Sequence, residues 1–341
     1  MPCSMRRCRE QAGDDPVAVA QDHIQDRVRL IALNVAISIL TFNRVSVLRE
    51  LLDSLTALNR TVREVIVVDN CSEDGTQEMV RSHSVRPTYV RLDRNIGAAA
   101  RNHGLKMTTA DIVVTLDDDI MGLDDGAIER LIRLFESNPC LGAVNFQIRD
   151  YFTGERCNWV HHKIEEIYAD KEFPTYEITE GAVAFRKTAI EAAGYYADDF
   201  FLSHEGPDLA YRIMDQGYEI YYCGKVSVRH RHENTGRKAW YNYYYDTRNL
   251  FWLAARNLPV AYALRYVSRG AVAMLIYSLR DRFFIYWLRG VRDGLAGISR
   301  AAKKRRVVRP ETIWAMARID EDRPDIIYYL KKRLFRKSAR L

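Results

Sequence analysis

Short apolar runs alternate with amphipathic segments along the first 120 residues. Segments 34–40, 65–68, 89–92 and 112–116 are rich in β-branched residues and have the length of strands. Between the first two runs, apolar side chains recur at helical spacing: Val47, Leu48, Leu51, Leu52 and Leu55. This order of strand, helix and strand predicts an α/β domain with a Rossmann-like, mostly parallel sheet flanked by helices.

Polar side chains gather where these predicted strands end. They are Thr41, Asn43, Asp69, Asp117, Asp118 and Asp119. In open α/β sheets, ligands bind beyond the carboxyl ends of strands. Adjacent carboxylates become tolerable when a divalent cation lies between them, and oxygen donors suit Mg²⁺ or Mn²⁺. The three aspartates therefore indicate a metal or ligand site, with a solvated acidic turn as the alternative.

Charge is distributed unevenly along the 341 residues. Residues 251–341 carry 21 Lys and Arg against 7 Asp and Glu, so +14, whereas the whole chain is only +6. Arginines and aromatic residues interleave there on helical segments, which is typical of helices that lie on an anionic membrane surface. The alternative is a helical domain with a solvated basic side. We expect no nucleic acid partner, because no known reading motif accompanies the charge.

These patterns divide the chain into three predicted parts. Residues 1–30 are polar and are expected to be disordered, and they lack the apolar centre of a signal peptide. Residues 31–249 form the predicted α/β domain, and 250–341 a helical, basic C-terminal region. The sequence contains no uninterrupted apolar run of the roughly 18–20 residues that a membrane span requires.

Six segments in this order carry a family resemblance: "ISILTFNR", "VIVVDNCSEDGT", "RNIGAAARNHG", "TLDDDI", "EGAVAFRKTAI" and "FFLSHEGPDLAYRI". Together they resemble the family 2 glycosyltransferases, including rhamnosyltransferase-like members, over about 34–248. The resemblance implies a GT-A fold and transfer of a sugar from a nucleotide-sugar donor with inversion at the anomeric carbon. It also implies a divalent cation, Mg²⁺ or Mn²⁺.

The resemblance assigns roles to the polar residues already noted. Asp117 and Asp119 are the expected metal ligands, Asp119 the firmer of the two. His230 is the expected third ligand, with His232 as an alternative. Thr41, Asn43 and Asp69 are assigned to the nucleotide, and Asp118 to the ribose or the metal. Arg101 is assigned to the diphosphate, or alternatively to a structural ion pair with a carboxylate.

An inverting transferase also needs a general base for the acceptor hydroxyl. The family typically shows Glu-Asp-x-Asp-Leu in this region, whereas this chain has Gly206 in place of the second acid. Glu205 is therefore the expected base and Asp208 the alternative, with His204 a further titratable group. Asp208 equally suits the amino-terminal cap of the helix expected over 209–216.

These expectations combine into one function. The chain is expected to be an inverting, metal-dependent glycosyltransferase that acts in cell-envelope polysaccharide biosynthesis on a glycan or lipid-linked acceptor. We expect it in the cytoplasm, peripherally bound at the inner face of the cell membrane. The alternatives are a sugar nucleotidyltransferase, for which the loop after the first strand lacks the required glycines, and a non-catalytic sugar- or lipid-binding scaffold.

Overall fold

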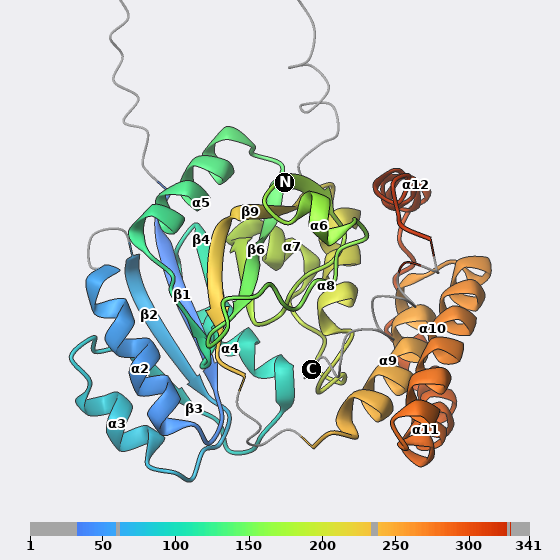
Figure 1. Cartoon of the computed structure of the whole chain (residues 1–341), viewed down its shortest axis with the longest axis horizontal. Coiled ribbons are helices and arrows are strands. Elements are labelled where there is room, and N and C mark those ends of the chain that lie inside the picture. The colour runs from blue at the N-terminus through green and yellow to red at the C-terminus, as the bar shows by residue number, and fades with distance from the viewer. Residues whose placement is uncertain (1–32, 59–61, 233–237, 326–327, 329–341) are drawn as a thin grey trace, which may run out of the picture.

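The computed structural model describes residues 33–58, 62–232, 238–325 and 328, and the segment expected to be disordered, 1–30, lies outside them. One nine-stranded sheet forms the centre of the molecule, with helices on both faces (Figure 1). Its main path runs in the order β3-β2-β1-β4-β8-β6-β9-β5, and β7 pairs with β9.

The first four strands are parallel and agree with the strands predicted from the sequence. They are β1 (Val35–Thr41), β2 (Val62–Asp69), β3 (Thr88–Arg91) and β4 (Ile112–Asp117). The connecting helices are α2 (Val45–Leu55), α3 (Thr76–Ser82) and α4 (Arg101–Met107), with 3-10 turns η1 (Thr56–Leu58) and η2 (Gly97–Ala100). Parallel pairing brings the carboxyl ends of β1, β2 and β4 to one edge.

The second half makes the sheet mixed rather than mostly parallel. β8 (Ala182–Arg186) runs antiparallel to both β4 and β6 (Leu141–Asp150), whereas β9 (Glu219–His230) is parallel to β6. Two short strands, β5 (Ile120–Met121) and β7 (Glu172–Thr175), also pair antiparallel with β9. The helices here are α5 (Asp125–Ser137), α6 (Glu165–Tyr168), α7 (Lys187–Ala193) and α8 (Glu205–Asp215).

Both faces of the sheet are covered, and β4 shows how its sequence permits this. Ile112, Val114 and Leu116 pack into one core cluster, whereas Val113 packs into a second on the opposite face. Because successive strand residues point to opposite faces, a continuous apolar run suits a strand buried on both sides. The hydrophobic core thus fixes the position at which the aspartates leave the sheet.

Four C-terminal helices pack as a separate layer beside the sheet domain (Figure 1). They are α9 (Tyr241–Asn257), α10 (Val260–Arg280), α11 (Phe284–Lys303) and α12 (Pro310–Ile319). The domain boundary predicted after residue 249 falls inside α9, which packs against α8 as well as α10 and α11. None of the described helices combines the length and the apolarity needed to cross a bilayer.

Glycines on one side of α11 allow it to approach α9 closely. A Cβ at Gly290 would lie 2.7 Å from the backbone oxygen of Tyr244 and 2.8 Å from Cβ of Thr247. One turn further along, the Trp252 indole N–H donates to the backbone oxygen of Gly294 at 3.1 Å. Side chains larger than glycine on this side of α11 would push the two helices apart.

We therefore expect Gly290→Leu to lower the free energy of unfolding by about 1–3 kcal/mol, the usual cost of overpacking. Chemical denaturation followed by circular dichroism measures this change. Ala296→Leu, on the exposed side of the same helix, is the matched control and should shift stability by about 0.5 kcal/mol or less. Equal effects of the two substitutions would contradict a close α9–α11 contact.

Candidate active site

Two of the three aspartates are buried beside β1 and share one arginine. The Thr41 hydroxyl donates to Oδ2 of Asp118 at 2.8 Å. Nη1 of Arg44 lies 3.1 Å from Oδ1 of Asp118 and 2.5 Å from Oδ2 of Asp119. Burial raises the pKa of Asp118 to about 7, and Arg44 opposes that rise. Burial acts in the same direction on Asp119, but His230 and Arg44 outweigh it and lower its pKa.

The third aspartate, Asp117, is paired with Arg101. Nη2 of Arg101 donates to Oδ1 of Asp117. Burial works against the charge of Arg101, but Asp117 outweighs it and raises the arginine pKa. Nε of Arg101 is buried and finds no hydrogen-bond partner among the described residues. One face of this guanidinium therefore keeps a donor that an anionic ligand would satisfy.

His230, at the end of β9, faces Asp119. Its Nε2 lies 3.4 Å from Oδ1 of Asp119, and its Nδ1 lies 2.9 Å from the side-chain nitrogen of Asn158. The ring of His232 lies 3.7 Å away, centroid to centroid. Pairing of Ile120 with His230 between β5 and β9 sets this approach.

One observation indicates that this arrangement fits a divalent cation. Oδ1 of Asp119 is buried and accepts no well-aligned hydrogen bond from the described residues, although His230 lies within ion-pair distance. Carboxylate and imidazole suit Mg²⁺ or Mn²⁺ when substrate phosphates complete the coordination. The described residues hold no ready group of three or more acidic, His or Cys ligands. Protein ligands alone would therefore leave such a cation incompletely coordinated.

The residues expected to bind the nucleotide serve mainly to shape the loops after β1 and β2. Asp69 is fully buried, and it accepts from the Ser72 backbone N–H at 2.8 Å and from the Tyr89 hydroxyl at 2.5 Å. Asn43 has φ 52° and its side-chain oxygen accepts from the Glu73 backbone N–H at 2.8 Å. Both side chains thus fix the edge to which the nucleotide was assigned.

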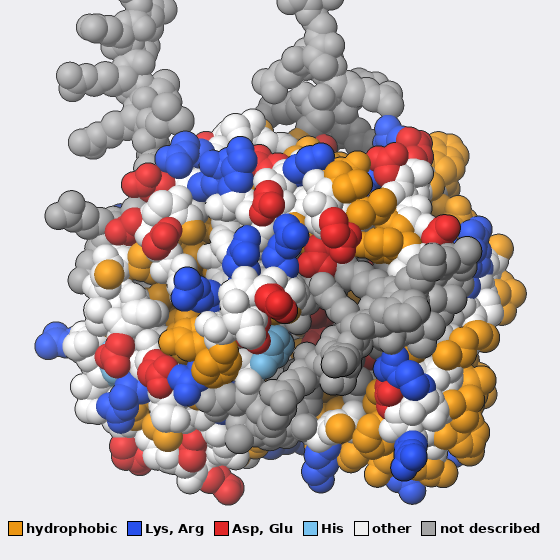
Figure 2. All heavy atoms as spheres, viewed as in Figure 1, with side chains coloured by type: hydrophobic (Ala, Val, Ile, Leu, Met, Phe, Trp, Pro, Cys, Tyr) orange, Lys and Arg blue, Asp and Glu red, His pale blue; other side chains and the backbone are white. Residues whose placement is uncertain are grey.

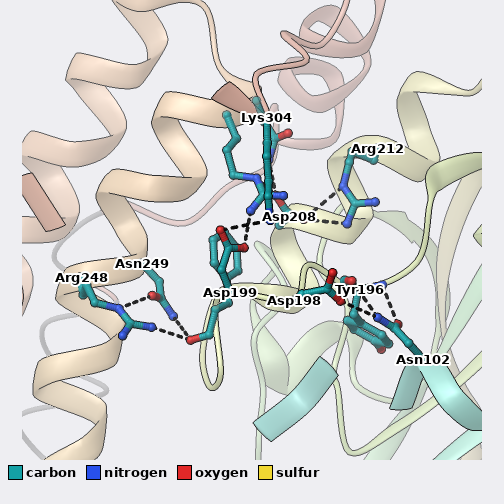
Figure 3. A network of polar contacts seen from close by, with 12 residues as sticks. Asn102, Tyr196, Asp198, Asp199, Asp208, Arg212, Arg248, Asn249 and Lys304 are labelled. Carbon is teal, nitrogen blue, oxygen red and sulfur yellow. Dashed lines mark hydrogen bonds and ion pairs between the residues drawn. The ribbon is translucent and has the colours of Figure 1, made fainter. Parts of the chain in front are cut away.

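Asp208 and Glu205 both lie in the first turn of α8, but their surroundings differ. Asp208 is fully buried and lies 2.6 Å from Nη2 of Arg212, and Asn257 donates to it at 2.7 Å (Figure 3). Nε of Arg256 lies 3.7 Å from it. Glu205 is also buried and contributes, with Asp117, to the negative field at Arg101. Asp208 therefore points to the C-terminal helices, whereas Glu205 belongs with Arg101.

Two residues of α9 hold the loop that precedes α8. The side-chain nitrogen of Asn249 donates to the backbone oxygens of Leu202 and Ser203, each at 2.7 Å. Nη2 of Arg248 donates to the backbone oxygen of Phe200 at 2.7 Å (Figure 3). The C-terminal helices thus determine where the acidic first turn of α8 lies.

His204 ends this loop and also contacts the helical layer. Its φ is 65°, and its Nδ1 lies 3.1 Å from the Tyr266 hydroxyl on α10. Burial lowers the pKa of His204, although Asp246 opposes the shift. This histidine therefore sits at the junction between the two layers.

Sequence reasoning missed two charged residues that lie among these groups. Arg44 bridges Asp118 and Asp119, and Glu180 belongs to the charges that surround Arg101. Arg44 follows the first predicted strand by a few positions, and a charged residue just after a strand was the available signal for it. Glu180 precedes no predicted strand; it is next to Gly181, whose backbone oxygen accepts from the Asp117 N–H.

Comparison with solved structures identifies the fold as GT-A. Staphylococcus aureus TarS 1–349 in complex with UDP-GlcNAc superposes with a TM-score of 0.56 at 15% identity, covering 89% of this chain and 92% of that one. A mannosyltransferase from Pyrobaculum calidifontis, in complex with GDP-Man and Mn²⁺, gives a TM-score of 0.51 at 19% identity, with 91% and 93% covered. The predicted fold class is confirmed.

Residues 36–195 match the family model "Glycosyl transferase family 2". The O-antigen chain rhamnosyltransferase WbaN of Salmonella anatum is 23% identical over 194 residues, which cover 54% of this chain and 61% of that protein. Residues 36–195 are thus similar to the family 2 glycosyltransferases, as the sequence motifs predicted. The match leaves more than a third of that relative uncovered.

The surroundings of Asp208 give a test of its role. We expect Asp208→Asn to destabilise the fold by about 3–5 kcal/mol, because it removes the buried charge that compensates partly buried Arg212 and buried Arg256. Urea unfolding measures the change. Asp198→Asn is the control, since Asp198 is exposed and lies 3.4 Å from Asn102 in the adjoining network (Figure 3). Unchanged stability of Asp208→Asn with lost activity would instead favour catalysis.

Proposed function

We propose that this chain transfers a sugar from a nucleotide-sugar donor to a hydroxyl of a lipid-linked or other cell-envelope glycan, with inversion at the anomeric carbon. The observation that carries the proposal is the acidic end of β4, where three aspartates, two of them buried, meet Arg44, Arg101 and His230 at the ligand-binding edge of the sheet. The match of residues 36–195 to the family 2 glycosyltransferase model and the similarity to an O-antigen chain rhamnosyltransferase support it.

Asp119 and His230 would hold the divalent cation, with Asp117 and Asp118 beside them. When bound, such a cation stabilises the charge that develops on a departing diphosphate. Arg101 contributes its unsatisfied Nε–H to the same anion. Thr41 and the Asn43 loop orient the nucleotide by holding Asp118 and the edge after β1.

The acceptor hydroxyl must lose a proton as its oxygen attacks the anomeric carbon. Of the two acids predicted for this task, Asp208 is engaged by Arg212 and Asn257, whereas Glu205 lies with the charges around Arg101. We therefore assign the base to one of the glutamates whose charges act on Arg101, Glu180 or Glu205.

We expect Asp119→Ala to abolish transfer, because it removes the carboxylate that would hold the cation, while the chain stays folded because Arg44 keeps its contact with Asp118. Removal of divalent metal with EDTA should have the same effect, and Mn²⁺ should restore activity to the unmodified chain. Release of nucleoside diphosphate from a panel of nucleotide sugars measures transfer. The control is Glu136→Ala, on the exposed side of α5. Activity that survives both treatments would refute the metal-dependent mechanism.

We further propose that the outer side of α10 and α11 binds an anionic membrane. Exposed apolar residues follow one stripe on each helix, and they include Leu264, Val272, Leu279, Leu288 and Leu295. In Figure 2, hydrophobic side chains with basic ones among them line the right-hand edge of the molecule, the side on which Figure 1 places α10 and α11. Arg265, Arg269, Arg289 and Arg292 are exposed on the same helices. Apolar burial and attraction to anionic lipid would act together there.

The full chain should therefore sediment with phosphatidylglycerol-containing vesicles, bind weakly to neutral vesicles, and be largely released by high salt. Leu264→Glu should reduce sedimentation, because it places a charge in the apolar stripe. Phe152→Glu is the matched control, since both side chains are 68% exposed but Phe152 lies on the sheet domain. Equal binding to neutral and anionic vesicles, or none to either, would exclude this surface as a membrane site.

A further inference from the structure

We infer that Glu180, rather than Glu205, is the carboxylate that takes the proton of the acceptor hydroxyl. This inference rests on the proposed function and names a catalytic residue within it. Glu180 precedes β8 and lies far from α8 in sequence, so it belongs to neither acidic motif considered above. Its position beside Gly206 carries the argument.

The Glu180 carboxylate occupies the space that a side chain at residue 206 would need. Oε1 of Glu180 accepts from the Gly206 backbone N–H at 2.8 Å. A Cβ at position 206 would lie 2.2 Å from the same oxygen and 2.6 Å from the backbone oxygen of Ile178. Glycine is thus required where the motif would otherwise place an acid, and a carboxylate from the turn before β8 fills the position.

Exposure separates Glu180 from Glu205. Glu205 is only 3% exposed, whereas Glu180 is partly exposed, so an acceptor hydroxyl reaches Glu180 with less rearrangement. A general base must come within hydrogen-bond distance of the proton that it removes. One Glu180 oxygen holds the Gly206 N–H, and a carboxylate retains acceptor capacity beyond that bond.

A buried hydroxyl within electrostatic reach of Glu180 also lacks a hydrogen-bond partner among the described residues. Tyr196 is 2% exposed, and its hydroxyl finds no hydrogen-bond partner among the described residues. The tyrosine is within electrostatic reach of Arg101, Glu180 and Glu205. Its backbone is fixed by Asn102, whose side-chain oxygen accepts from the Tyr196 N–H at 2.9 Å (Figure 3). A ligand hydroxyl that reached this region would satisfy the hydrogen-bonding capacity of Tyr196.

Glu180 also borders the donor side of the site. The next residue, Gly181, lies so close to Asp117 that a Cβ there would be 3.1 Å from Oδ2 of the aspartate. Asp117 in turn holds Arg101, which carries the donor assigned to the diphosphate. Burial raises the pKa of Glu180, and Arg101 opposes that rise. The carboxylate therefore lies between the donor groups and the start of α8.

In the assigned step, the acceptor oxygen forms a bond to the anomeric carbon as the bond from that carbon to the diphosphate oxygen breaks. The nucleoside diphosphate leaves with the bonding electron pair. The acceptor hydroxyl proton passes to Glu180 and is later released to water. One proton and one leaving group balance the transfer.

Two isosteric variants of the full chain test the assignment. Glu180→Gln keeps an oxygen that accepts the Gly206 N–H, so it preserves a structural role and removes only the base. We expect it to lower kcat by roughly 10²-fold or more while leaving donor affinity and unfolding stability near those of the wild type. Glu205→Gln should lower kcat by a smaller factor. Calorimetric titration with the nucleotide sugar provides the affinity.

The outcomes separate the two levels of inference. A near-normal kcat in Glu180→Gln, or a larger loss in Glu205→Gln, would overturn the assignment while the glycosyltransferase proposal stands. A loss in Glu180→Gln confined to donor affinity would also overturn it, because Glu180 would then only position the donor. Wild-type protein that transfers no sugar from any donor would refute the proposed function and this assignment with it.

Discussion

Compensation of three adjacent carboxylates at the end of a buried strand is the constraint on which this site depends. Their mutual repulsion in a region of low dielectric would be severe if they were left alone. The fold answers with one arginine from the loop after β1 and another from α4, so that Arg44 spans Asp118 and Asp119 while Arg101 holds Asp117. The same two arginines therefore compensate the carboxylates and fix the loop after β1 and the start of α4 at this edge of the sheet.

The same logic links the C-terminal helices to the sheet domain. Asp208 is buried only because Arg212, Arg256 and Asn257 surround it, and two of these three come from α9. Removal of one of the two arginines would leave the buried charge of Asp208 less compensated. Since α9 also holds the loop before α8 through Asn249, the helical layer is part of the site's architecture as well as a surface for other contacts.

The sequence predicted the parallel strands well because apolar, mostly β-branched residues dominate β1, β4 and the second half of β2, and polar residues follow at their ends. It did not predict that half of the strand pairs are antiparallel, since pairing direction depends on contacts between distant segments such as β4 and β8. For the same reason it identified the aspartates but missed Arg44 and Glu180. Arg44 meets Asp118 across 74 residues of sequence. Glu180 reaches its position only because residue 206 is a glycine.

The geometry also shows how one carboxylate can serve both the free and the ligand-bound protein. Arg44 contacts Oδ2 of Asp119, whereas Oδ1 of the same side chain faces His230. A cation approaching Oδ1 would therefore leave the Arg44 contact in place, with His230 on the same side of the carboxylate. Arg44 compensates the buried charge of Asp119 in the absence of ligand, and Oδ1 of Asp119 stays available for a ligand.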